Sequence, residues 1–373
     1  CIRDRYISLA LLRLDESKKE ESKEYFLKGI ELSPNYAMAR ERYARALMTG
    51  GDQSDDEEAL PHLRKAVELD PMSAVMTEAL GMALWYLGRV EEAQATLLKG
   101  IERNPEYPWT YFRMASQLLR LGRVGESVNW VRAAARLAPS DFHLKIYECY
   151  LYRDLGAFQS ADRCYDSAEE DFPERTSGHR VFLYLSQSQL QEATELVEQL
   201  AQTERTLFVS GKSREELLAH YYLVIGEVDK ARSIYQELEP RLYGDEDIST
   251  VGREWAQITM VAYTLYADGQ LDRANYLFDR VLEVLHSRHR TRGRGYGTTD
   301  VFIHATRGEK QKAISALREA IDMGWRMDWW MLHSPLYDSM REEQEWNDLV
   351  HELEADIARQ RQWYESHKDD PLF

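Results

Sequence analysis

Residues 71–105 read PMSAVMTEALGMALWYLGRVEEAQATLLKGIERNP, and this stretch decides the fold. Its apolar residues, spaced three or four positions apart, predict a first helix that ends at Gly88, because glycine readily takes the left-handed conformation that closes a helix. A second apolar pattern begins at Val90 and stops before Pro105, since proline cannot continue a helix. The stretch therefore predicts a helical hairpin, which is a pair of helices joined by a short turn.

This hairpin recurs at a fixed interval. Prolines and glycines repeat with a step of 34 residues, at Pro71, Pro105, Pro139 and Pro173 and at Gly88, Gly122 and Gly156. On these residues the chain resembles the tetratricopeptide repeat, whose period is 34 residues. The resemblance implies an all-α fold in which hairpins stack into a right-handed superhelical solenoid, with a concave groove lined mainly by the first helix of each pair.

Small residues mark the place where the two helices of a pair approach most closely. In the quoted stretch these are Gly81 and Ala93, and a leucine at position 81 is expected to push the helices apart. Other units hold small residues at the same places, at Ala44 and Ala59, Ala115 and Ser127, and Cys149 and Ala161. Beyond Pro173 a turn residue is followed five positions later by alanine at Ser188/Ala193, Gly226/Ala231, Gly269/Ala274 and Gly308/Ala313. The whole chain then forms about nine hairpins.

The spacing divides the chain into three parts. We expect a regular array at residues 1–173, degenerate hairpins at 174–323, and capping helices at 324–373. The last part is rich in tryptophan, and its sequence AIDMGWR followed by DWWMLHSPLYDSMREEQEW resembles the end of the arrays in bacterial membrane regulators. Such regulators carry a winged-helix or adenylate-cyclase-type output domain. The resemblance implies a sensory or scaffolding part on the periplasmic side of a membrane; without it, a cytoplasmic location is expected.

The charge balance limits the partners. The chain has 47 Lys and Arg against 64 Asp and Glu, a net charge of −17, which repels nucleic acid and acidic membrane surfaces. No window approaches the roughly 20 apolar residues that cross a bilayer, so we expect no membrane insertion of this segment. A protein or peptide partner is the best match to this composition.

The cysteines are three, Cys1, Cys149 and Cys164, and they form no CxxC motif. This number and spacing indicate neither a zinc site nor a disulfide framework. We expect buried free thiols. The alternative is a pair between Cys149 and Cys164, because these residues fall on the two helices of one predicted hairpin.

Motifs that carry catalysis are missing. The sequence contains no HExxH, no GxxxxGK[ST] and no GxSxG, so we predict that the chain is not an enzyme and holds no cofactor and no metal. One basic cluster opposes the net charge, at Arg288, Arg290, Arg292 and Arg294. Either it is a solvated loop, or it binds an acidic segment of a partner, because arginine binds carboxylates in a bidentate manner.

The resemblance also implies which side chains line the groove, namely those at places 2, 5, 9 and 12 of each unit. For the three regular units these are Val75, Glu78, Met82 and Trp85, then Trp109, Phe112, Ser116 and Leu119, then His143, Ile146, Tyr150 and Arg153. Relatives that bind chaperones grip a carboxylate with lysine at place 5 and asparagine at place 9, which this chain lacks. We predict that a peptide or helix of a partner contacts Met38, Arg45, Met48, Glu78, Met82, Trp85, Trp109, Phe112, Tyr150 and Arg153.

Three other interpretations of this apolar, aromatic groove remain open. The superhelix itself covers the aromatic residues, or a second copy of the chain fills the groove and makes the protein a self-associating scaffold. In the third, the array tethers an enzyme domain that these 373 residues do not contain.

Overall fold

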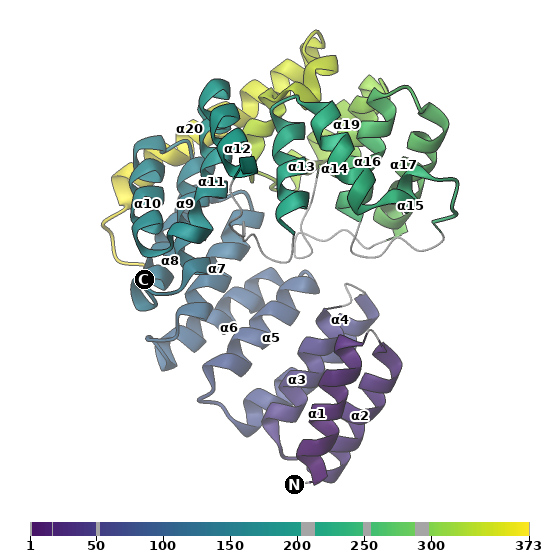
Figure 1. Cartoon of the computed structure of the whole chain (residues 1–373). Coiled ribbons are helices and arrows are strands. Elements are labelled where there is room, and N and C mark those ends of the chain that lie inside the picture. The colour runs from purple at the N-terminus through teal and green to yellow at the C-terminus, as the bar shows by residue number, and fades with distance from the viewer. Residues whose placement is uncertain are drawn as a thin grey trace. The chain divides into compact units, whose positions relative to one another are not determined.

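The computed structural model describes residues 2–16, 18–49, 53–202, 213–248, 255–287 and 298–372. These ranges consist of helices and turns, and they contain no strand (Figure 1). The chain divides into two compact units, of which unit 1 ends at Gln117 and unit 2 begins at Leu118. None of the helices in these ranges combines the length and the apolar character that crossing a bilayer requires.

Unit 1 holds the N-terminal helices of the chain. They are α1 (Ile2–Asp15), α2 (Lys19–Leu32), α3 (Ala37–Met48), α4 (Gln53–Leu69), α5 (Ala74–Tyr86), α6 (Val90–Arg103) and most of α7 (Pro108–Arg120). Unit 2 holds the remaining ones. They are α8 (Val124–Leu137), α9 (Phe142–Asp154), α10 (Phe158–Asp171), α11 (Pro173–Ser186), α12 (Leu190–Gln202), α13 (Arg214–Val224), α14 (Val228–Leu238), α15 (Pro240–Tyr243), α16 (Trp255–Ala267), α17 (Leu271–Ser287), α18 (Thr299–Thr306), α19 (Lys310–Asp322), two 3-10 helices η2 (Trp329–His333) and η3 (Pro335–Met340), and α20 (Gln344–His367).

Consecutive helices pack against each other as hairpins. The pairs are α1/α2, α3/α4 and α5/α6 in unit 1, and α9/α10, α11/α12, α13/α14, α16/α17 and α18/α19 in unit 2. The first helices of neighbouring pairs also contact each other, as α3 does with α5 and α9 with α11. We call the surface that the first helices form within one unit the first-helix face of that unit. The arrangement confirms the predicted all-α solenoid of helical hairpins.

The turns inside the hairpins confirm the predicted role of glycine. Gly88, Gly122 and Gly156 all have φ between 67° and 78°, in the left-handed region. The residue after each glycine donates its backbone N–H to a carbonyl five residues earlier, as Arg89 does to Leu84 at 2.9 Å, which satisfies a carbonyl at the end of the first helix. Ser188, which stands where the other units have glycine, adopts the same conformation with φ 60°.

The small residues lie in the interior of the hairpins, as predicted. Ala44, Ala59, Ala93, Ala115 and Ala161 have no exposed surface. A Cβ atom added to Gly81 would lie 2.6 Å from Cδ2 of Leu97 and 3.6 Å from the carbonyl oxygen of Ala93. The α5/α6 pair therefore has no room for a side chain at position 81.

We predict that Gly81→Leu destabilises unit 1 by at least about 1–3 kcal/mol, the usual cost of overpacking a core. The added side chain would overlap Leu97, and the α6 helix would have to move away from α5 to remove the overlap. Urea unfolding followed by circular dichroism measures the effect. The matched control is Ala95→Leu, which adds comparable bulk at an exposed position of α6 and should change the free energy of unfolding by less than about 0.5 kcal/mol. Equal stability of the two variants would contradict the predicted close packing.

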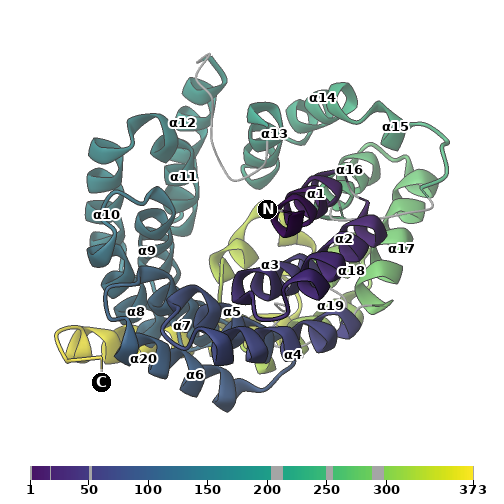
Figure 2. The same cartoon turned by 90° about the horizontal axis from the view of Figure 1, so that it is seen from below.

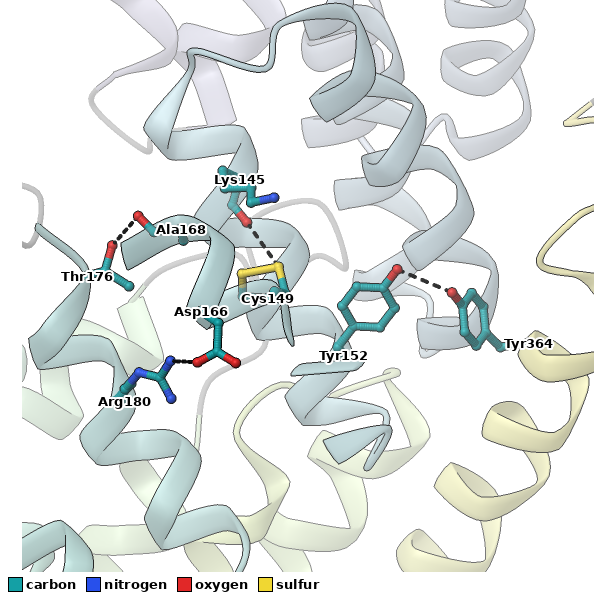
Figure 3. Close-up of a disulfide and its surroundings, with 9 residues drawn as sticks. Lys145, Cys149, Tyr152, Asp166, Ala168, Thr176, Arg180 and Tyr364 are labelled. Atoms are coloured by element: carbon teal, nitrogen blue, oxygen red, sulfur yellow. Dashed lines mark hydrogen bonds and ion pairs between the residues drawn. A yellow bond between two sulfur atoms is a disulfide. The ribbon is translucent and has the colours of Figure 1, made fainter. Parts of the chain in front are cut away.

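The cysteines correct the sequence-based expectation of free thiols. Cys149 of α9 and Cys164 of α10 form a disulfide, with Cα atoms 5.3 Å apart and sulfur atoms 2.13 Å apart (Figure 3). Both side chains are buried between the two helices. The two cysteines pair because Cys149 lies where the helices approach most closely and Cys164 lies opposite it on the other helix. This is the alternative that the sequence left open.

We predict that reduction of this disulfide lowers the stability of the protein by about 3 kcal/mol, since the bond closes a loop with a sequence separation of 15 and restricts the unfolded chain. Urea unfolding with and without a reductant tests this. The Cys149→Ala/Cys164→Ala double variant should not respond to the reductant. Thiol labelling of the unfolded, unreduced protein should modify Cys1 alone; labelling of all three cysteines would refute the bond.

Candidate functional site

A ladder of ion pairs joins the first helices of unit 1. Glu78 of α5 is 2% exposed, and it accepts hydrogen bonds from Arg45 of α3, at 2.5 Å, and from Arg113 of α7. Arg45 also pairs with Glu41 on its own helix. Burial lowers the pKa of Arg45, but the charges of Glu78 and Glu41 outweigh it and raise that pKa. The predicted residues Arg45 and Glu78 are therefore brought together, and each compensates the charge of the other.

The aromatic and methionine residues predicted for unit 1 differ in exposure. Trp85, Phe112 and Met48 are 3%, 6% and 4% exposed, so they belong to the packed interior. Trp109 is half-buried and meets Phe112 edge to face, with ring centroids 5.5 Å apart. The remaining methionines are Met82, which is half-buried, and Met38, which is 42% exposed. Among the aromatic residues predicted for unit 1, Trp109 is therefore the most exposed.

In unit 2 the C-terminal segment returns to hairpins that precede it by some two hundred residues. Helix α20 packs on α19 and also on α8, beside which it lies in both views (Figures 1 and 2). Its side chains reach the carbonyls of two hairpin turns, with Gln360 donating to Gly122 at 2.6 Å and Arg361 donating to Gly156 at 2.8 Å. Tyr364 meets Tyr152 of α9, hydroxyl to hydroxyl, at 3.3 Å (Figure 3).

The approach of this segment requires a glycine at position 324. Gly324 has φ 101°, and a Cβ atom there would lie 2.5 Å from the carbonyl oxygen of Arg120 and 2.8 Å from the carbonyl carbon of Leu121. The residues that follow are thereby placed against the first helices of unit 2. The indole N–H of Trp329 donates to the backbone carbonyl of Asp154 at 2.8 Å, and that of Trp330 donates to Asp154 Oδ1 at 3.3 Å.

A cleft of about 320 Å³ opens where this segment meets the first-helix face of unit 2. Three first helices, α9, α11 and α13, supply side chains to it, and the end of α7 and the loop before η2 complete it. The lining residues are Leu119, His143, Tyr147, Tyr150, Leu151, Arg153, Asp154, Phe182, His220, Met327, Asp328 and Met331. The groove positions Leu119, His143, Tyr150 and Arg153, inferred from the sequence, thus share one cleft.

The cleft holds a buried arginine, Arg153, which is 3% exposed. Its guanidinium donates to Asp154 Oδ1 at 2.8 Å and 3.0 Å, and it also pairs with Asp328. Its Cζ lies 5.1 Å from the ring centres of both Tyr150 and Trp330. Burial lowers the pKa of Arg153, but the two carboxylates outweigh it and raise that pKa. Arg153 is therefore charged and fully compensated by its surroundings.

Several polar atoms of this region are buried without a hydrogen-bond partner among the described residues. They are Asp154 Oδ2, Tyr165 Oη, His179 Nε2 and Tyr221 Oη. Burial raises the pKa of the Asp154 carboxyl, although Arg153 acts to lower it. Burial and the charges of Arg153 and Arg175 lower the pKa of His179 to about 3, so its imidazole is neutral and pairs with the Tyr150 hydroxyl. An unsatisfied buried group costs about 1–3 kcal/mol, which makes this cluster unusual.

Sequence reasoning missed the residues that come from the C-terminal segment and from α11 and α13. Asp328 stands out in the structure, because it holds a left-handed backbone conformation with φ 53°, which aspartate tolerates better than most residues. The ring centroids of Phe182 and His220 lie 5.8 Å apart, and those of Phe182 and Trp330 lie 6.0 Å apart. No motif in the sequence marks these residues, since each has an ordinary role in a helix or turn when taken alone.

Two further predictions concern charges and metals. The basic cluster Arg288, Arg290, Arg292 and Arg294 lies outside the described residues. Within the described residues, no three His, Cys, Asp or Glu side chains are grouped so that they could hold a metal ion.

Comparisons with known proteins identify the repeat. Residues 78–142 and residues 4–36 each match a family described as the tetratricopeptide repeat. No curated protein sequence matches the chain significantly. Similar solved structures include PilF of Pseudomonas aeruginosa, 20% identical, with 64% of this chain and 97% of that chain covered and a TM-score of 0.44. They also include a tetratricopeptide repeat protein of Parabacteroides merdae, 13% identical, with 70% and 98% covered and a TM-score of 0.48.

A third similar structure is PilW, described as a type IV pilus biogenesis factor, which is 16% identical, with 54% of this chain and 96% of that chain covered and a TM-score of 0.45. The family matches, taken with the helical hairpins and their left-handed turns, agree with the period of 34 residues. The chain therefore contains tetratricopeptide repeats at residues 4–36 and 78–142, and proteins built from this repeat are generally non-catalytic scaffolds that bind other proteins.

Proposed function

We propose that the chain is a protein-interaction module that binds a peptide or helix of a partner on its first-helix faces. The observation that carries this proposal is the cleft of unit 2, about 320 Å³ in volume, which gathers side chains from three successive first helices. Clefts of about 300–1,000 Å³ with apolar walls and a few polar groups are typical binding sites. Tyr147, Tyr150 and Phe182 supply the aromatic part of this lining.

In unit 1 the same function is assigned to the surface around Trp109. This side chain is half-buried, and it packs edge to face against the buried Phe112. Half-buried aromatic residues on a rigid support are the usual anchors of protein interfaces. The predicted partner-binding residues that are buried, such as Met48 and Trp85, would then act through the packing of unit 1 and not by touching the partner.

A more specific role follows from the resemblance of the C-terminal segment. We propose that the module is the sensory or scaffolding part of a larger bacterial regulator. The disulfide supports a location on the far side of the membrane in such a regulator, because disulfides persist in oxidising compartments such as the periplasm.

We predict that Tyr147→Ala and Trp109→Ala each weaken capture of the partner by about 30-fold, which corresponds to about 2 kcal/mol for an aromatic anchor. The measurement is a quantitative pull-down in which the purified chain captures proteins from an extract of cells that make it. Each captured protein that a variant fails to retain is then purified and titrated against the wild type and the variants. Tyr266→Ala, a half-buried tyrosine of α16 outside the cleft, is the matched control.

Helicity and thermal stability of each variant must equal those of the wild type for the comparison to count. Light scattering across protein concentration separates a true partner from self-association. The proposal fails if both variants retain every interaction of the wild-type chain, or if the binding that they lose is binding to a second copy.

A further inference from the structure

In the cleft of unit 2, acidic side chains outnumber arginines and lysines. One cation, Arg153, faces two carboxylates, those of Asp154 and Asp328. The guanidinium also lies against the rings of Tyr150 and Trp330, so its positive charge is stabilised without a further anion. Two acidic side chains therefore share one arginine in this cleft.

Asp154 is the group with an unmet requirement. Its Oδ1 accepts hydrogen bonds from Arg153 and from the indole of Trp330, whereas its Oδ2 has no partner among the described residues. The side chain is 1% exposed and is one of those that line the cleft. A buried carboxylate oxygen without a donor destabilises the structure, and a charged N–H donor would satisfy it best.

The walls of the cleft suit a cation as well. Tyr147, Tyr150 and Phe182 line it together with the thioethers of Met327 and Met331. Aromatic faces attract ammonium and guanidinium groups, and the attraction is stronger where water is excluded. A carboxylate in the same place would meet the like charge of Asp328, because Arg153 is already paired.

We propose that the cleft of unit 2 binds the ammonium or guanidinium group of a lysine or arginine side chain in a basic segment of the partner, with Asp328 as the counter-charge and Asp154 as a hydrogen-bond acceptor. This inference rests on the proposed function and names the chemistry of the partner. The net charge of −17 acts in the same direction, because it draws basic segments toward the chain and repels acidic ones.

The test uses small amides that carry one side chain and no free carboxylate. The probes are Nα-acetyl-arginine amide and Nα-acetyl-lysine amide, and the neutral control is Nα-acetyl-citrulline amide, which has nearly the shape of the arginine probe. The readout is the indole N–H NMR signals of Trp329 and Trp330, since both indoles donate to Asp154. We expect saturable shifts with the two cations and about tenfold weaker binding of citrulline amide.

Asp328→Asn tests the counter-charge, because it removes one charge while it keeps an oxygen that can accept from Arg153. This variant should bind the arginine probe about tenfold more weakly than the wild type. Asp322→Asn, which removes an exposed carboxylate outside the cleft, should bind as the wild type does. Circular dichroism confirms that both variants are folded. Equal binding by the Asp328→Asn variant and the wild type, or equal binding of citrulline and arginine amides, would overturn the inference.

The two proposals fail separately. If Tyr147→Ala abolishes capture of a partner while neither cationic amide shifts the indole signals, the cleft is an interface without a cation site and this inference is wrong. If the amides bind as described while no partner depends on Tyr147, the cation site stands and the proposed function is wrong.

Discussion

Close contact between two helices at a small residue is the constraint on which the structure depends. The first helix of a hairpin ends at a residue with a left-handed backbone, and a small residue follows five positions later. In the α5/α6 pair the helices are then so close that Gly81 has no room for a side chain beside Leu97. Within each unit, the two helices of a hairpin pack against each other and against the neighbouring hairpin. Because the step is regular, the first helices of a unit come to share one face, and we propose that a partner binds there.

In unit 2 the regular step has a second consequence. Turn carbonyls recur with the same period as the hairpins, so one long helix can be held at two of them, and α20 contacts Gly122 and Gly156 through adjacent side chains. This contact brings Asp328 to Arg153 and the tryptophans of η2 to Asp154, both on α9, from a sequence distance of about 175 residues. The cleft and its charges are therefore a product of the returning segment as much as of the repeats.

The repeat geometry could be predicted from the sequence because it depends on local chemistry. Glycine at a left-handed turn and alanine at a close contact act within a few residues of their position, and even Ser188 follows the same rule. The disulfide was only an alternative, since two cysteines on one hairpin pair only when both point into the same gap. The cleft could not be predicted beyond Leu119, His143, Tyr150 and Arg153, because the partners of Arg153 include Asp328, which no periodicity connects to α9.

The placement of the C-terminal segment against Asp154 is the central claim, and hydrogen exchange of the tryptophan indoles tests it most directly. Trp329 and Trp330 donate their indole N–H groups to Asp154, whereas Trp363 on α20 is 37% exposed. The account predicts that the first two indole hydrogens exchange far more slowly than that of Trp363. Equal exchange rates for the three indoles would contradict it.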